Sequence, residues 1–168
     1  MTFIKIDPKE LGENPFKMLD DRWALITAGD KTGFNTMTAS WGGLGVLWHM
    51  NVATCYVRPQ RHTHEFIQNS DHFTLSFFTE DYRAALKLCG SKSGKDTDKV
   101  KECGFTVAEA ASGGIYFEQA NLVIACKKLY TDRFDPRGFN DDRIAACYSP
   151  DDYHYLYIGE IVEILKAE

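Results

Sequence analysis

Residues 34–41 read FNTMTASW, and this stretch with its neighbours decides the fold class. A short apolar run, residues 22–28 (RWALITA), precedes it, and a turn bounded by two glycines separates the two runs. Two strand-like runs of this length joined by a glycine-bounded turn predict a β-hairpin. The chain therefore begins its main body with antiparallel β-structure.

Side chains in a strand alternate between two faces. One face of residues 34–41 carries the small hydroxyls of Thr36, Thr38 and Ser40, and the other carries Asn35, Met37, Ala39 and Trp41. A row of small hydroxyls lets a planar ligand approach the backbone amides while side chains satisfy its polar rim. Threonine-rich strands are also common without any ligand, so the pattern alone leaves both interpretations open.

Further runs of β-branched and aromatic residues predict strands, and three shorter segments predict helices. The expected strands are 51–58, 73–78, 115–130 and 153–165, and the expected helices are 63–69, 79–88 and 96–103. Thr79 and Asp96 are the expected helix-capping residues, and Gly104 is expected to end the third helix. Residues 131–152 are polar and loop-like. This order favours a single mainly β domain over residues 1–168, an antiparallel split β-barrel with inserted helices, over alternating β-α units.

The composition excludes several classes of protein. The 168 residues include 19 basic and 24 acidic side chains, a formal charge of -5, which argues against nucleic acid as a partner. The longest apolar stretches are far shorter than the roughly 20 residues of a membrane-spanning helix, and the first residues do not resemble a signal peptide. Five widely spaced cysteines without a C-x-x-C pair support neither a disulfide framework nor a structural zinc site. We therefore expect a cytoplasmic protein with reduced thiols.

Two glycine-rich segments resemble nucleotide-binding motifs but lack the required context. Residues 42–45, GGLG, begin like a dinucleotide fingerprint, but Trp48 occupies the third glycine position, so we expect these glycines to shape a turn. Residues 90–95, GSKSGK, resemble a P-loop. This segment is one residue short, and Asp96 stands where Ser or Thr would hold magnesium.

The histidines and the nucleophilic residues show no catalytic pattern. His62, His64 and His72 lie close in the sequence, but there is no H-E-x-x-H motif, and the two nearest histidines would leave a helix about 200° apart. The sequence has no G-x-S-x-G elbow, and no cysteine has a histidine near it in sequence that would suggest activation. We therefore expect neither a metal site nor a catalytic triad.

Residues 58–63, RPQRHT, form the most informative polar segment. Arg58 and Arg61 precede an expected helix whose first amides carry a partial positive charge, which suits an anion. Arginine binds phosphate in a bidentate fork, and Thr63 can donate a hydrogen bond while also capping the helix. A solvated turn explains the same spacing equally well.

In chain order, five segments resemble the flavin reductase-like family of FMN-binding split barrels, to which flavoredoxin belongs. They are FNTMTASWGGLGVLW, VRPQRHTHEFI, FTLSFF, LCGSKSGKDTDK and HYLYIGEIVEI, and the likeness runs from about Trp23 to Ile164. The resemblance implies a split β-barrel that binds FMN, uses NADH or NADPH as co-substrate, and forms a homodimer with the flavins near the interface.

The resemblance also implies roles for single residues. The isoalloxazine ring and ribityl chain would lie along Asn35, Thr36, Met37, Thr38, Ala39, Ser40 and Trp41. Arg61 and Thr63, with Arg58 nearby, would hold the phosphate, and Ser91 and Lys99 would approach the flavin from the other side. Asp98 would fix a helix end. His154 would lie beside the pyridine dinucleotide and is the one candidate catalytic residue, although Tyr153 stands where the family usually has an aspartate.

The activity implied is hydride transfer from NADH or NADPH to the flavin, followed by electron transfer to free flavin, oxygen, a ferric complex or a protein. One alternative is an FMN-binding electron carrier that a protein partner reduces. Another is a split barrel that serves a different ligand, such as pyridoxal phosphate or haem. A chain of net charge -5 that binds an anionic cofactor must concentrate positive charge locally, and the candidates are Arg58, Arg61, Lys92, Lys95 and Lys99.

Overall fold

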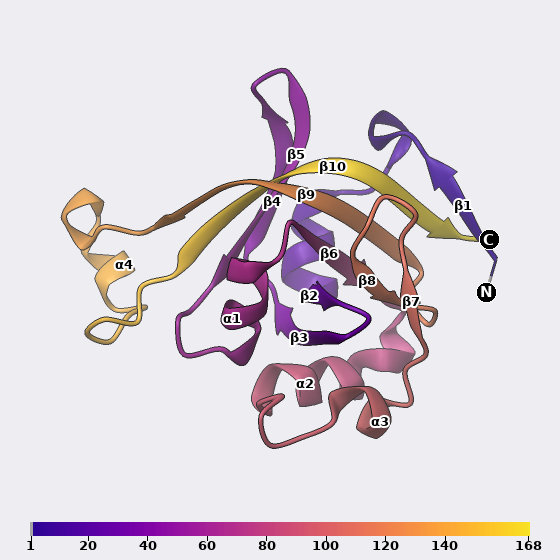
Figure 1. The fold of residues 1–168 in the computed structure, drawn as a ribbon. Helices are drawn as coiled ribbons and strands as arrows, with labels where there is room; N and C mark the ends of the chain where they lie inside the picture. Colours follow the sequence, from indigo (N-terminus) through magenta and orange to yellow (C-terminus); the bar gives the residue numbers. More distant parts are fainter. Residues whose placement is uncertain (1) are drawn as a thin grey trace.

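The computed structural model describes residues 2–168 as a curved antiparallel sheet with helices packed against it (Figure 1). The strand order is β3-β2-β6-β9-β10-β5-β4, and β1 is added to β10. These strands are β1 Phe3–Ile6, β2 Ala24–Asp30, β3 Gly33–Ala39, β4 Gly42–Leu47, β5 Met50–Val57, β6 His72–Phe77, β9 Leu122–Arg133 and β10 Tyr155–Ala167. A separate pair, β7 Val107–Glu109 and β8 Ile115–Phe117, packs beside β6 and β2. The prediction of a mainly antiparallel β fold with inserted helices is confirmed.

The helices are α1 His62–Asn69, α2 Arg83–Ser91, α3 Lys99–Cys103 and α4 Asp142–Ala145. A π-helical turn, Lys17–Arg22, leads into β2, and short 3-10 turns occupy Pro8–Glu10, Glu80–Tyr82 and Pro136–Gly138. Helices α1 and α2 pack on the β2–β3 hairpin, whereas α4 lies on the long excursion between β9 and β10 (Figure 1). Within residues 2–168, no helix has the length and hydropathy needed to cross a membrane.

The predicted hairpin is confirmed, and it packs at the centre of the fold. Strands β2 and β3 pair with Ile26 opposite Met37, and both side chains are buried in the main core inside the curved sheet. A second core lies on the outer side, where Leu25 and Val123 meet α2 and the aromatic residues around Phe105 and Phe117. Burial on both sides of β2 explains why its sequence is continuously apolar instead of alternating.

Strand β10 joins the β3-β2-β6-β9 part of the sheet to the β5–β4 pair and to β1. It pairs with β9 along most of its length, and its other edge pairs first with β5 and then with β1. Register shifts between Ile158 and Gly159 and between Ile161 and Glu163 bend the strand. A Cβ atom at Gly159 would lie 2.7 Å from the Phe73 ring and from the Cys126 Cβ, so only glycine fits this close approach.

Several element predictions are wrong. Residues 42–45 belong to β4 and do not form a turn, because they pair antiparallel with β5. A Cβ atom at Gly42 would lie 2.8 Å from the Thr54 carbonyl oxygen, so glycine here permits strand pairing. Residues 131–152 are not all loop, since β9 continues to Arg133 and α4 lies within the segment. The predicted strand 115–130 divides into β8 and β9.

The predicted helices are shifted at their first residues. The segment expected as helix 79–88 forms a 3-10 turn and then α2, and the Thr79 side chain caps neither. Helix α3 begins at Lys99, and Asp98, not Asp96, caps it by accepting a hydrogen bond from the Lys101 amide at 3.1 Å. The expected roles of Asp98 at a helix end and Gly104 as a helix terminator are confirmed.

Candidate functional site

A groove runs along the end of β3, where three adjoining pockets share lining residues. A pocket of about 240 Å³ lies between the start of α1 and the segment after α2. A second pocket, of about 450 Å³, lies between β3 and α2, and a third, of about 200 Å³, lies between β3 and the β5–β10 pair. Ser91 lines the first two pockets, and residues 38–40 line the second and third. We call these the cation pocket, the central pocket and the aromatic pocket.

Two basic side chains converge in the cation pocket, which Arg61 and Lys99 both line. Arg61 donates hydrogen bonds to the Gly90 carbonyl at 2.8 Å and to the Cys89 carbonyl at 3.4 Å. The Lys99 Nζ donates to the Cys89 carbonyl at 3.0 Å and to the Thr36 carbonyl at 2.6 Å. Within residues 2–168 neither side chain forms an ion pair with a carboxylate.

Lys99 is buried and Arg61 is half-buried, and neither has a counterion from the described chain. Lys99 is only 5% exposed, and burial lowers its pKa, which the neighbouring Arg61 charge lowers further. Burial also lowers the pKa of Arg61. Buried cations are costly unless they are paired, and like charges add to the cost. The pocket therefore suits an anionic ligand.

Asn35 and Thr63 connect β3 to α1 at the floor of this pocket. The Asn35 Nδ2 donates to the Thr63 Oγ1 at 2.8 Å, and both side chains are buried. Thr63 therefore does not cap α1, contrary to our expectation, because it lies one residue inside the helix and its hydroxyl faces Asn35. A Cβ atom at Gly94 would lie 2.0 Å from the Asn35 Oδ1, so Gly94 must be glycine for this contact to form.

The pocket contains residues that the sequence did not identify as a site. They are Gln60, His62 and Ser93, in addition to the expected Lys92 and Ser91. The Nδ1 of His62 is buried and has no hydrogen-bond partner among residues 2–168, and a carboxylate oxygen of Glu65 lies 3.4 Å away. Only the position of these residues within RPQRHT and GSKSGK signals their role, since each has an ordinary local pattern.

The hydroxyls along β3 are mostly used within the protein. Thr36 Oγ1 lies 2.9 Å from the buried Thr27 Oγ1, and Thr38 Oγ1 donates to the Leu86 carbonyl at 2.5 Å. Met37 is buried in the main core, although it also borders the aromatic pocket. This stretch therefore lines the groove mainly with the backbone and small side chains of residues 38–40 and with the half-exposed Trp41 ring.

Arg58 lies apart from Arg61. It forms an ion pair with Asp152, donates to the Cys147 carbonyl at 2.7 Å, and lies over the Tyr148 ring at 5.1 Å. It lines the aromatic pocket and not the cation pocket. The structure therefore places Arg58 as an anchor for the excursion between β9 and β10.

His154 also lies in the aromatic pocket, surrounded by Trp41, Tyr56 and Tyr148. Its Nδ1 lies 3.0 Å from the Tyr148 hydroxyl. Burial, with a smaller contribution from the Arg58 charge, lowers the pKa of His154 to about 4. The imidazole is therefore neutral at pH 7.

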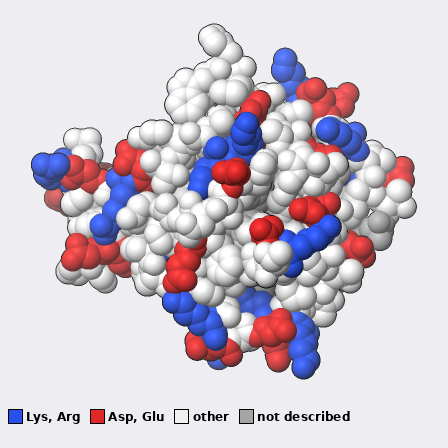
Figure 2. All heavy atoms as spheres, viewed as in Figure 1, with Lys and Arg blue, Asp and Glu red and all other residues white. Residues whose placement is uncertain are grey.

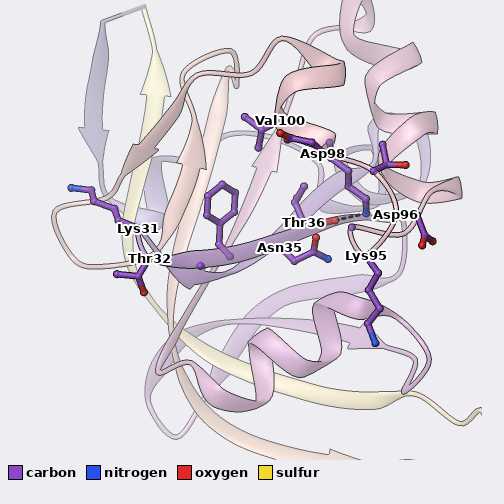
Figure 3. Close-up of a pocket in the computed structure, with 13 residues that line it drawn as sticks. Lys31, Thr32, Asn35, Thr36, Lys95, Asp96, Asp98 and Val100 are labelled. Carbon is purple, nitrogen blue, oxygen red and sulfur yellow. Dashed lines mark hydrogen bonds between the residues drawn. The ribbon is translucent and has the colours of Figure 1, made fainter.

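A neighbouring pocket of about 530 Å³ lies between the β2–β3 turn and α3 (Figure 3), and it shares Asn35, Gly94 and Lys99 with the cation pocket. Figure 3 shows Lys31 at its outer end and Lys95 directed toward α1. Lys31 is paired with Glu109 and Lys95 with Glu65, each at 2.8 Å. Because these lysines already have carboxylate partners, this pocket is less suited to a phosphate than the cation pocket is. Within residues 2–168 no group of three acidic, histidine or cysteine side chains forms a metal site.

Comparison with protein families gives one match. A family model described as "Flavin reductase like domain" matches residues 19–168. The match covers the three pockets and every residue that lines the groove. A comparison with curated proteins finds no significant match.

Several solved structures are similar to this chain. An FMN-binding domain of a flavin reductases-like enzyme from Shewanella baltica has a TM-score of 0.71 and 19% identity, and the match covers 98% of this chain and 77% of that one. Flavoredoxin from Methanosarcina acetivorans has a TM-score of 0.70 and 21% identity, with 88% and 69% covered. Nitrilotriacetate monooxygenase component B from Bacillus cereus has a TM-score of 0.68 and 18% identity, with 100% and 83% covered. At these identities the likeness establishes the fold, and it confirms the split-barrel class.

Proposed function

The chain belongs to the flavin reductase-like domain family, and from this premise we propose that it is an FMN-dependent oxidoreductase. It oxidises NADH or NADPH and passes the electrons to free flavin or another acceptor. Residues 1–168 act as a single FMN-binding domain in this proposal. The activity is consistent with the similarity to a flavin reductases-like enzyme and to a monooxygenase component.

The cation pocket is the observation that carries the proposal. Arg61 and Lys99 are held side by side on main-chain carbonyls and lack a carboxylate partner within residues 2–168. An FMN phosphate carries nearly two negative charges at pH 7 and accepts several hydrogen bonds. The donor set of this pocket therefore fits the phosphate end of FMN.

The rest of the groove fits the remainder of the cofactor. The central and aromatic pockets continue from the cation pocket along the backbone of residues 38–40, which gives a ribityl chain and a planar ring an apolar surface with polar edges. When bound, FMN supplies the redox chemistry. The protein holds the phosphate with Arg61 and Lys99, and it orients the ring against β3. No side chain needs to act as a general base.

The electron donor proposed is a nicotinamide. Neutral His154 and the half-exposed Trp41 line the aromatic pocket at the far end of the groove from the cation pocket, where a second planar ring can approach the first. The test is NADH or NADPH oxidation by the purified protein with and without added FMN. Flavin-stimulated turnover is expected. A protein that neither binds FMN nor oxidises nicotinamide in its presence overturns the proposal.

An FMN-binding electron carrier is the second candidate, and the similarity to two flavoredoxins favours it. In that case a protein partner, and not a nicotinamide, reduces the bound flavin. Stopped-flow reduction distinguishes the two candidates. Fast bleaching of the flavin absorbance by NADH or NADPH supports the enzyme, whereas reduction by dithionite alone supports the carrier.

We also propose that the protein works as a homodimer that uses the β4–β5 hairpin. This hairpin projects from the body of the fold, and residues 42–57 contain no Lys, Arg, Asp or Glu (Figures 1 and 2). Val46 is 74% exposed and Trp48 is 51% exposed, although both are apolar. Elsewhere Figure 2 shows acidic and basic side chains interspersed. An uncharged, apolar projection on a chain of net charge -5 suits burial against a second copy.

A further inference from the structure

Trp23 has a backbone conformation that bulky residues rarely adopt. It lies between the π-helical turn and β2, with φ of 68° and ψ of 160°. Glycine adopts such values without strain, whereas other residues persist there only when their surroundings hold them. Trp48 and His49 also have positive φ, but they form the two-residue turn of the β4–β5 hairpin, which requires it. Trp23 lies in no such turn.

Arg83 of α2 holds Trp23 in this conformation. Its guanidinium carbon lies 4.3 Å from the centre of the indole ring. The same guanidinium donates to the Asp21 carbonyl at 2.6 Å and to the Arg22 carbonyl at 3.5 Å, and it pairs with Glu80 at 3.1 Å. One side chain therefore fixes both the indole and the chain that leads to it.

The indole faces the groove as well as the core. Trp23 packs against the outer core cluster, yet it is only partly buried and lines the central pocket together with residues 38–40. It is the one aromatic residue that lines the central pocket in the described part of the chain.

We propose that Trp23 is a positioning residue for the flavin ring. This inference rests on the proposed function. The strained backbone directs the indole into the central pocket, where it contacts the isoalloxazine ring of FMN whose phosphate lies in the cation pocket. A residue kept only for packing would not need this conformation. Arg83 fixes the indole, and so it sets the position of the ring indirectly.

The test uses the fluorescence lifetime of bound FMN, because an indole in contact with an excited flavin quenches it within picoseconds. Trp41 lines the neighbouring aromatic pocket, so the parent protein is the Trp41→Phe variant. Adding Trp23→Phe is expected to lengthen the lifetime of bound FMN, whereas adding Phe16→Leu, at an exposed aromatic residue outside the three pockets, leaves it unchanged. Trp23→Leu is expected to raise the Kd for FMN by about three- to tenfold.

Arg83→Met provides a second variant that keeps the indole. It is expected to broaden the distribution of lifetimes, because the ring loses its anchor. Unchanged lifetimes in both the Trp23→Phe and Arg83→Met proteins, with FMN still bound, overturn the role of Trp23 and leave the proposed function intact. Failure of the wild-type protein to bind FMN overturns the proposed function, and this inference with it.

Discussion

Arg61 and Lys99 donate hydrogen bonds to the same main-chain oxygen, that of Cys89 near the end of α2. The two residues come from segments 38 positions apart in the sequence, yet their charges lie in one pocket, where burial lowers the pKa of both side chains and the Arg61 charge lowers that of Lys99 further. A protein gains nothing in stability from such an arrangement unless an anion completes it.

The contact between Gly94 and Asn35 is expected to be necessary for FMN binding. Gly94→Ala places a methyl group 2.0 Å from the Asn35 Oδ1 and displaces the side chain that donates to Thr63. Loss of this hydrogen bond leaves the Asn35 and Thr63 side chains less well positioned. The Kd for FMN is expected to rise by about fivefold, which corresponds to about 1 kcal/mol of binding free energy. Fluorescence titration with FMN measures this Kd. Gly138→Ala is the control, because its Cβ would meet nothing within 4 Å.

Arg58 is expected to matter for the excursion between β9 and β10 more than for the phosphate. Arg58→Met removes the ion pair with Asp152 and the bond to the Cys147 carbonyl. We expect faster amide hydrogen exchange in residues 134–153, with the Kd for FMN changed by less than about threefold. A loss of affinity as large as that of an Arg61 variant would assign Arg58 to the phosphate, as the family resemblance implies.

His154 is expected to make stability depend on pH. Its pKa is about 4 in the folded protein and about 6.5 in the unfolded chain, so the unfolded chain binds the proton first as the pH falls. The free energy of unfolding is therefore expected to fall between pH 6.5 and pH 4, by up to about 3 kcal/mol, and to be unaffected by this group above pH 6.5. Urea unfolding of His154→Gln should show a shallower slope in that window. His49→Asn, at an exposed turn, should retain the parent slope.

The β4–β5 hairpin is expected to hold the dimer. Val46→Glu places a carboxylate on its most exposed apolar position, and twofold symmetry brings two such charges into one interface. The dimer is expected to dissociate at least about tenfold more readily, which sedimentation analysis measures. Ile4→Glu changes an exposed apolar residue of β1 and should leave the oligomeric state unchanged. A monomeric parent protein would contradict the proposal directly.

Local patterns in the sequence predict most of the sheet but not its edges. The β2–β3 hairpin follows from its apolar runs and glycine-bounded turn. The sequence does not predict strand β4, because its three glycines have poor strand propensity. These residues form a strand because they pair with the edge of β5 that β10 leaves free. The start of α3 was misplaced because Asp96 and Asp98 are equally good caps locally, and packing of Lys99 into the pocket decides between them.

The candidate site was only partly predictable for a similar reason. The motifs identified Arg61, Thr63, Ser91 and Lys99, which the fold brings into one pocket. They did not reveal that Arg58 turns to Asp152, because the partner lies 94 residues away. They also did not reveal Trp23, whose significance lies in a backbone angle that no residue pattern encodes. A cytoplasmic location stays a prediction.

The most direct test of the phosphate assignment compares FMN with riboflavin, which has the same ring and ribityl chain but no phosphate. We expect the wild-type protein to bind FMN more tightly by about 1.5 to 3 kcal/mol, and Arg61→Ala to remove most of that difference with the fold intact. The control Arg137→Ala, an exposed arginine paired with Asp135, should retain it. Equal Kd values for FMN and riboflavin in the wild-type protein would contradict the account.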